Sequence, residues 1–119
     1  MRRKRKSART TYSKHSYVVA PNRIKELAVK KPLEVLVGDI TYLRMEGNNY
    51  AYLYLLTDLF SRLIVGYHVS RDLTHYSALI ALGKAVETVG ENAVRNAIHH
   101  TDRGCQYCCR EYLNALAQY

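Results

Sequence analysis

The sequence predicts an α/β protein in which a mixed β-sheet is joined by a crossover helix. Apolar and β-branched residues recur at 33–43, 50–56 and 63–69, and short turns separate these runs. After Thr74 the apolar spacing changes to three and four residues, and a fourth apolar run follows Gly90. The predicted order is β-β-β-α-β-α. Its long crossover allows the fourth strand to lie parallel to the first.

The first three predicted strands have different compositions. Residues 33–43 are followed by a polar, glycine-containing segment at 46–49, which has the composition of a turn. Residues 50–56 alternate tyrosine with alanine or leucine, so we expect this strand to be covered on both faces. The tyrosines could stack on nucleic-acid bases, but packing beneath a helix is the preferred interpretation. Residues 59–62 then turn the chain into the third strand, 63–69.

The second half of the chain begins with an amphipathic helix. Leu79, Leu82, Val86 and Val89 recur at helical spacing, and Gly90 stands where a C-terminal cap is expected. A short strand at 96–100 and a helix at 110–118 follow. Glu111 lies near the start of that last helix, where charge complementarity with the helix dipole accounts for an acid.

Charge divides the 119 residues into two regions. Residues 1–31 contain eleven Lys or Arg and a single acid, whereas residues 32–119 contain seven basic and nine acidic side chains. We therefore expect a basic arm and linker over 1–32 and a folded domain over 33–119. Such arms commonly bind phosphate backbones. A nuclear or membrane-surface address signal and a solvated tail without one partner are alternatives. The predicted DNA-binding residues are Arg2, Arg3, Lys4, Arg5, Lys6, Arg9 and Lys14.

Composition favours the cytoplasm. The longest apolar run, residues 50–56, is far shorter than the roughly 20 residues of a membrane span, so no membrane partner is expected. The basic start does not lead into the apolar region of a signal peptide. The three cysteines are odd in number and clustered within five positions, which does not resemble a disulfide framework. Together with two histidines they suggest a zinc site, whose candidate ligands are His99, His100, Cys105, Cys108 and Cys109. This set lacks the distant second pair of ligands that a zinc site usually has. Semi-buried packing is preferred for them.

Two acids interrupt predicted strands and are candidate metal ligands. Asp39 lies inside the first strand, and Asp102 lies just beyond the fourth strand, where the chain passes into a turn that contains Gly104. A carboxylate at a strand is costly to bury and well suited to hold a divalent ion. Asp39 alone could instead be a structural acid beside Gly38. Asp58 also ends a strand, but hydrogen bonding to the Ser61-Arg62 turn explains it better than a metal ion does.

Three motifs resemble those of bacterial insertion-sequence transposases of the DDE type, whose catalytic domain is similar to retroviral integrase. In order along the chain they are Asp39-Ile40-Thr41-Tyr42, Thr57-Asp58-Leu59-Phe60-Ser61-Arg62, and His100-Thr101-Asp102-Arg103-Gly104-Cys105-Gln106-Tyr107. The segment at 10–22 also resembles the approach to that domain. The resemblance covers nearly the whole chain.

This resemblance implies a ribonuclease H-like fold with strand order 3-2-1-4. It also implies metal-dependent phosphoryl transfer on DNA, with Mg²⁺ or Mn²⁺ as cofactor. Asp39 would bridge the metal ions, Asp102 would hold one, and Arg103 is a candidate phosphate contact or a plain surface arginine. The family uses a third acid, a Glu that would lie beyond Tyr119. We therefore expect a core that is incomplete at its C-terminus, inactive alone, and poorly soluble or homo-oligomeric. A non-catalytic DNA-binding remnant is the main alternative.

Overall fold

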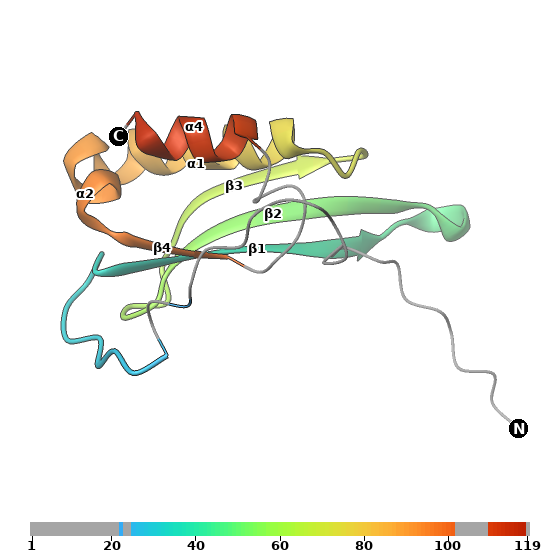
Figure 1. The fold of residues 1–119 in the computed structure, drawn as a ribbon. Helices are drawn as coiled ribbons and strands as arrows, with labels where there is room; N and C mark the ends of the chain where they lie inside the picture. Colours follow the sequence, from blue (N-terminus) through green and yellow to red (C-terminus); the bar gives the residue numbers. More distant parts are fainter. Residues whose placement is uncertain (1–21, 23–24, 102–109, 119) are drawn as a thin grey trace, which may run out of the picture.

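The sheet is built from strands β1 (Val35–Arg44), β2 (Tyr50–Asp58), β3 (Ile64–Ser70) and β4 (Ile98–Thr101). The computed structural model describes residues 22, 25–101 and 110–118. β1 and β2 pair antiparallel, as do β2 and β3, and β4 lies parallel to β1. The order is β3-β2-β1-β4 (Figure 1). The predicted α/β fold and the predicted strand order 3-2-1-4 are confirmed, as is the parallel placement of the fourth strand.

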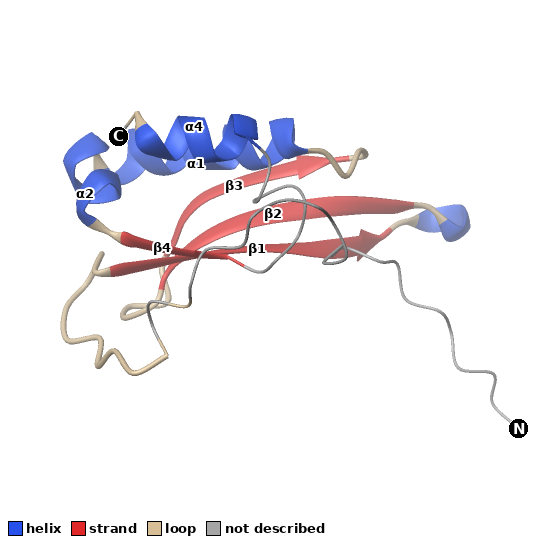
Figure 2. Cartoon of the chain, viewed as in Figure 1, coloured by secondary structure: helices blue, strands red, loops and turns tan. Residues whose placement is uncertain are grey.

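Helices cover one face of this sheet. Helix α1 (His75–Val89) and helix α4 (Arg110–Ala117) lie above the strands in the same layer, and α2 (Glu91–Asn96) connects α1 to β4 (Figure 2). The core between these layers includes Leu36, Tyr54, Leu56 and Ala85. Because side chains alternate along a strand, every second residue of each strand points away from this core.

Gly66 shows which row of the sheet faces α1. A Cβ atom at Gly66 would lie 2.3 Å from the carbonyl oxygen of Ala81 in the helix. Gly66 is opposite Leu56, which is in turn opposite Gly38. These positions therefore share the helix-covered face. The adjacent row, which contains Asp39, lies on the other face.

That other face is partly open to solvent. In register with Asp39 are Leu55, which is half-buried, and Tyr67, which is 55% exposed. Val69, two residues on from Tyr67, is 47% exposed. The expectation that β2 is covered on both faces therefore holds on the α1 side and only in part on the opposite side. The helix layer of the described residues lies on one face alone (Figure 1).

Tyr54 fixes the connection between the sheet and α1. Its ring is fully buried, and its hydroxyl donates to the carbonyl of Asp72 at 3.1 Å and accepts from the amide of Thr74 at 3.0 Å. Burial raises the pKa of Tyr54, so the phenol keeps the proton that it donates. The packing of this tyrosine beneath a helix is as predicted, although Tyr50 and Tyr52 are only half-buried.

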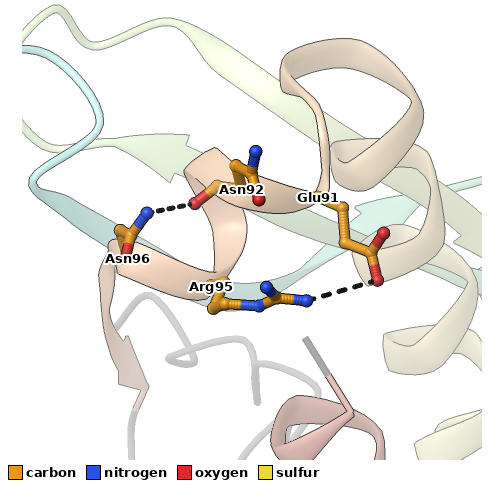
Figure 3. Close-up of polar contacts among 4 residues, drawn as sticks. All are labelled: Glu91, Asn92, Arg95 and Asn96. Atoms are coloured by element: carbon orange, nitrogen blue, oxygen red, sulfur yellow. Dashed lines mark hydrogen bonds and ion pairs between the residues drawn. The ribbon is translucent and has the colours of Figure 1, made fainter.

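The short helix α2 is an element that the sequence pattern did not indicate. Gly90, with φ of 90°, ends α1 and also precedes α2 directly. The six residues of α2 are too few to show an apolar repeat. Polar contacts form between residues within this helix (Figure 3). Arg95 lies 3.9 Å from Glu91, and the Asn96 side chain donates to the Asn92 carbonyl at 2.9 Å. As a result β4 begins at Ile98, two residues later than expected.

Candidate metal and nucleic-acid site

Asp39 presents an exposed carboxylate in the middle of β1. Its Oδ1 accepts a hydrogen bond from the amide of Ile40 at 2.8 Å, which orients the side chain. No basic residue in the described part of the chain forms an ion pair with it. The flanking residues Gly38 and Ile40 are buried, so the backbone that carries the carboxylate is held within the sheet. The second oxygen thus has no protein partner among the described residues.

The pairing of β1 with β4 brings the two sequence motifs together. Gly38, immediately before Asp39, lies opposite Thr101, immediately before Asp102 in the sequence. Parallel pairing aligns the carboxyl-terminal directions of the two strands. Asp102 and Arg103 lie outside the described residues, as do the arm residues 1–14. The metal-ligand and phosphate-contact assignments of these residues stay predictions.

The described donor set fits a divalent ion only as part of a larger site. Within residues 22, 25–101 and 110–118, no three His, Cys, Asp or Glu side chains are placed to hold a metal. Asp39 offers a hard oxygen donor, the type that Mg²⁺ and Mn²⁺ prefer over nitrogen or sulfur. The donor chemistry of Asp39 is therefore suitable, and at least one further acid is required.

Asp58, the other acid of the strand motifs, is a structural carboxylate. It is 1% exposed and accepts hydrogen bonds from the amides of Leu33, Phe60 and Ser61 and from the Ser61 hydroxyl. Burial alone would raise the pKa of Asp58, but these hydrogen bonds outweigh it and hold the pKa below its usual value. The predicted role in the Ser61 turn is thus supported, and the bond to Leu33 is an additional one.

His99 and Tyr112 form a buried polar contact beside β4. The Tyr112 hydroxyl lies 2.8 Å from Nε2 of His99. Burial, together with the charge of neighbouring His100, lowers the pKa of His99 to about 4. This contact engages one ring nitrogen of a histidine that zinc binding would need. The three cysteines lie outside the described residues, so the packing interpretation of that cluster stays a prediction.

The sequence pattern did not reveal the partners of His99, Tyr112 or Leu33. These contacts join residues 13 and 25 positions apart, and no periodicity links such positions. Local turn chemistry did indicate the bond between Asp58 and Ser61, because an acid at a strand end followed by serine is a common turn signal.

Comparison with known proteins fits this arrangement of strands and helices. The family model described as the integrase core domain matches residues 29–119. The chain belongs to the integrase core domain family. Members of this family generally use divalent metal ions. The match includes both acids and all of the described secondary structure.

Curated relatives of this integrase core are proteins of insertion elements, including transposases. This chain is 34% identical over 116 residues to the transposase InsF for insertion sequence IS3A of Escherichia coli strain K12. It is also 33% identical to the insertion element IS600 uncharacterized 31 kDa protein of Shigella sonnei. These matches cover 97% and 93% of this chain but only 39% and 40% of the relatives. The integrase core thus spans about two fifths of their length. No solved structure matches it.

Proposed function

We propose that this chain forms part of the catalytic core of a transposase that breaks and joins DNA by metal-dependent phosphoryl transfer. The parallel pairing of Gly38 with Thr101 supports this most directly, because it places the residue before Asp39 in β1 opposite the last residue of β4, which precedes Asp102 in the sequence. The match of the integrase core domain to residues 29–119 and the similarity to transposases of insertion elements also support it.

In this proposal Asp39 and Asp102 are the carboxylate ligands of Mg²⁺ or Mn²⁺. Asp39 has one oxygen oriented by the Ile40 amide, and its exposure leaves the carboxylate accessible to an ion and a phosphate. A bound ion of this kind polarises a scissile phosphodiester and stabilises the leaving oxygen. The contribution of the chain would be to hold two like charges close together beside the pairing of β1 with β4, where a cation would relieve their repulsion.

DNA is the proposed substrate and partner. The basic residues of the first 31 positions would neutralise phosphates of the duplex without reading its sequence, and Arg103 would add a contact near the acids. The charge asymmetry also favours a second candidate function, a DNA-binding module without catalysis. The two differ in metal dependence: the module alone would bind DNA equally with and without Mn²⁺.

The cytoplasm as compartment and self-association are further parts of the proposal. None of the helices in the described part of the chain has the length and hydropathy needed to cross a bilayer. Partly exposed Tyr67 and Val69 on the open sheet face support self-association. Sedimentation at several protein concentrations tests it, and a strictly monomeric protein would contradict it.

Calorimetric titration with Mn²⁺ tests the metal site. Asp39→Asn and Asp102→Asn should each weaken binding on the order of tenfold or more, about 1.4 kcal/mol, because one anionic ligand is lost. Glu87→Gln is a matched control, since Glu87 is an exposed acid on α1 and its loss changes the net charge equally. Equal Mn²⁺ affinity in the wild type and both Asp variants would reject the metal site.

A further inference from the structure

Asp58 is a buried carboxylate whose described partners are all hydrogen-bond donors without a positive charge. The Leu33 amide donates to Oδ1 at 3.0 Å, and the Ser61 amide donates to Oδ2 at 3.2 Å. The Phe60 amide at 3.3 Å and the Ser61 hydroxyl complete the set. Among the described Lys, Arg and His side chains, none forms an ion pair with it. Charged acceptors make stronger hydrogen bonds than neutral ones, so this carboxylate can fix several backbone groups together.

Two of the segments held by Asp58 contain a strained backbone. Leu33 and Arg62 both have positive φ, 61° and 67°, in the left-handed region that favours glycine. The amide of Leu33 donates to the Asp58 side chain, and the amide of Arg62 donates to the Asp58 carbonyl at 2.9 Å. Such conformations persist where the surrounding contacts over-determine them. Asp58 therefore joins the chain that enters β1 to the turn between β2 and β3.

Backbone contacts next to the Asp58 carboxylate lie at the start of β1. Asp58 lies opposite Leu36, and the amide of Leu59 donates to the carbonyl of Val35 at 3.0 Å. The four residues of β1 that pair with β4, Val35 to Gly38, start beside this point. A shift of one residue in register would move Asp39 from the exposed face to the face covered by α1. The pairing of Gly38 with Thr101 would be lost as well.

We propose that Asp58 is a positioning residue for the metal site, holding β1 in the register that presents Asp39 beside the end of β4. The expected effect of Asp58 on metal affinity rests on the proposed function. Its structural part, control of the β1 register, does not depend on the metal. Asp58 is the last residue of β2 and lies near the start of the β1–β4 pairing, whereas Asp39 follows the last paired residue, Gly38. Asp58 therefore acts through the backbone of β1 and not as a ligand.

The experiment compares Asp58→Asn with Asp72→Asn, an exposed acid before α1, in the full 119-residue chain. Nuclear Overhauser contacts between opposite residues, Asp39 with Leu55 and Gly38 with Leu56, report the register, and calorimetry reports Mn²⁺ affinity. In Asp58→Asn we expect these contacts to weaken or shift and the Mn²⁺ affinity to fall at least about fivefold, while Asp72→Asn matches the wild type.

Rescue distinguishes positioning from a general loss of stability. Adding Leu33→Gly to Asp58→Asn should restore part of the register contacts and of the Mn²⁺ affinity, because glycine adopts the positive φ without strain. Ser61→Ala removes one of the four hydrogen bonds to the Asp58 carboxylate, along with the bond that the Ser61 hydroxyl accepts from the Leu63 amide, and provides a milder variant if Asp58→Asn does not fold. It should show the same changes at smaller size.

The outcomes separate this inference from the proposed function. Unchanged register contacts in folded Asp58→Asn and in Ser61→Ala would overturn the positioning role, whatever happens to Mn²⁺. Shifted contacts in a protein whose Mn²⁺ binding does not depend on Asp39 would support control of the register and reject the metal site instead. Lower stability with unchanged contacts and unchanged Mn²⁺ affinity would leave Asp58 with a folding role alone and so reject the inference.

Discussion

The hydroxyl of Tyr112 in α4 lies 2.8 Å from Nε2 of His99 in β4, and the two rings are 5.6 Å apart. Tyr112 is 1% exposed. The contact ties the helix after residues 102–109 to the strand before them. It therefore joins the two ends of the sequence segment that contains Asp102. No described residue hydrogen-bonds the buried Nδ1 of His99, so a charged imidazolium would leave one N–H donor without a described partner.

The first prediction is that the protein loses stability in mild acid because of His99. Its pKa is about 4 in the folded protein, whereas the unfolded chain takes up a proton at about 6.5. The unfolded state thus binds more protons between these values. Stability is full above pH 6.5 and falls as the pH drops towards 4, by up to about 3 kcal/mol. Urea unfolding at pH 7.0, 5.5 and 4.5 measures this loss.

Two variants assign the effect to His99. His99→Gln should be less stable at pH 7 but should show a flatter pH dependence, because the titrating group is gone. His68→Gln removes a histidine from β3 and controls for the loss of an imidazole elsewhere in the sheet. The effect of His99 can be distinguished from that of Asp58 by its pH range. The contribution of Asp58 to stability is lost only below the usual pKa of a carboxyl group, because the pKa of Asp58 is lowered in the folded protein. An identical slope in His99→Gln and wild type would show that another group is responsible.

The second prediction concerns the close contact between β3 and α1 at Gly66. Alanine at this position would place its Cβ 2.3 Å from the Ala81 oxygen and 2.8 Å from the Ala85 nitrogen. Both are backbone atoms, so the helix must move away from the sheet. Gly66→Ala should destabilise by roughly 1–3 kcal/mol or more, the usual range for overpacking.

Gly83 in α1 provides a matched control for this substitution. A Cβ at Gly83 meets no atom within 4 Å. Gly83→Ala should therefore raise stability by about 0.5–1 kcal/mol, because alanine favours a helix more than glycine does. Thermal or urea unfolding of both variants checks the pair. Equal effects of the two substitutions would contradict the close packing at Gly66.

The type of most elements followed from local pattern in this chain, while the order of the strands in the sheet came from the family resemblance and the contacts that fix the site had no signal in the sequence. Alternation in β2 and helical spacing in α1 are repeats within single elements, so periodicity indicates them. Helix α2 has only six residues and escaped that signal. The position of Asp39 beside the end of β4 required the family resemblance, because sequence order alone does not specify which strands are neighbours. The bonds of Asp58 to Leu33 and of His99 to Tyr112 depend on tertiary packing and have no local signature.

The third prediction is that the basic arm supplies the salt-dependent part of DNA binding. Each phosphate contact should contribute about 0.9 to the slope of log K against log salt on B-DNA. Deleting residues 1–14 removes seven of the eleven basic side chains among residues 1–31 and should flatten the slope markedly. Fluorescence anisotropy with a labelled duplex over a salt series measures it.

A charge-matched variant completes this test. Replacing the seven arm residues by glutamine keeps the length of the chain and should flatten the slope as much as the deletion does. Replacing Arg44 and Arg71, exposed cations of the folded part, should have a smaller effect. A slope that survives both arm variants would move the DNA-binding surface to residues 15–119.

The fourth prediction is that a polypeptide of these 119 residues does not cut or join DNA by itself. The family resemblance implies phosphoryl transfer with three acids, whereas the proposed site has two, Asp39 and Asp102, and no acid follows Glu111 in these 119 residues. Glu111 is on α4 near its N-terminus, which favours a negative charge on electrostatic grounds. With one ligand missing, an ion would be held poorly and the charge that develops on the leaving oxygen would lack stabilisation.

Strand-transfer assays with Mn²⁺ and an oligonucleotide that carries the end of the element should give no product. Product formed by the wild type and abolished by Asp39→Asn, without any added protein, would show that two acids suffice. Product that persists in Asp39→Asn would point to a contaminating nuclease, because the proposed chemistry requires that carboxylate.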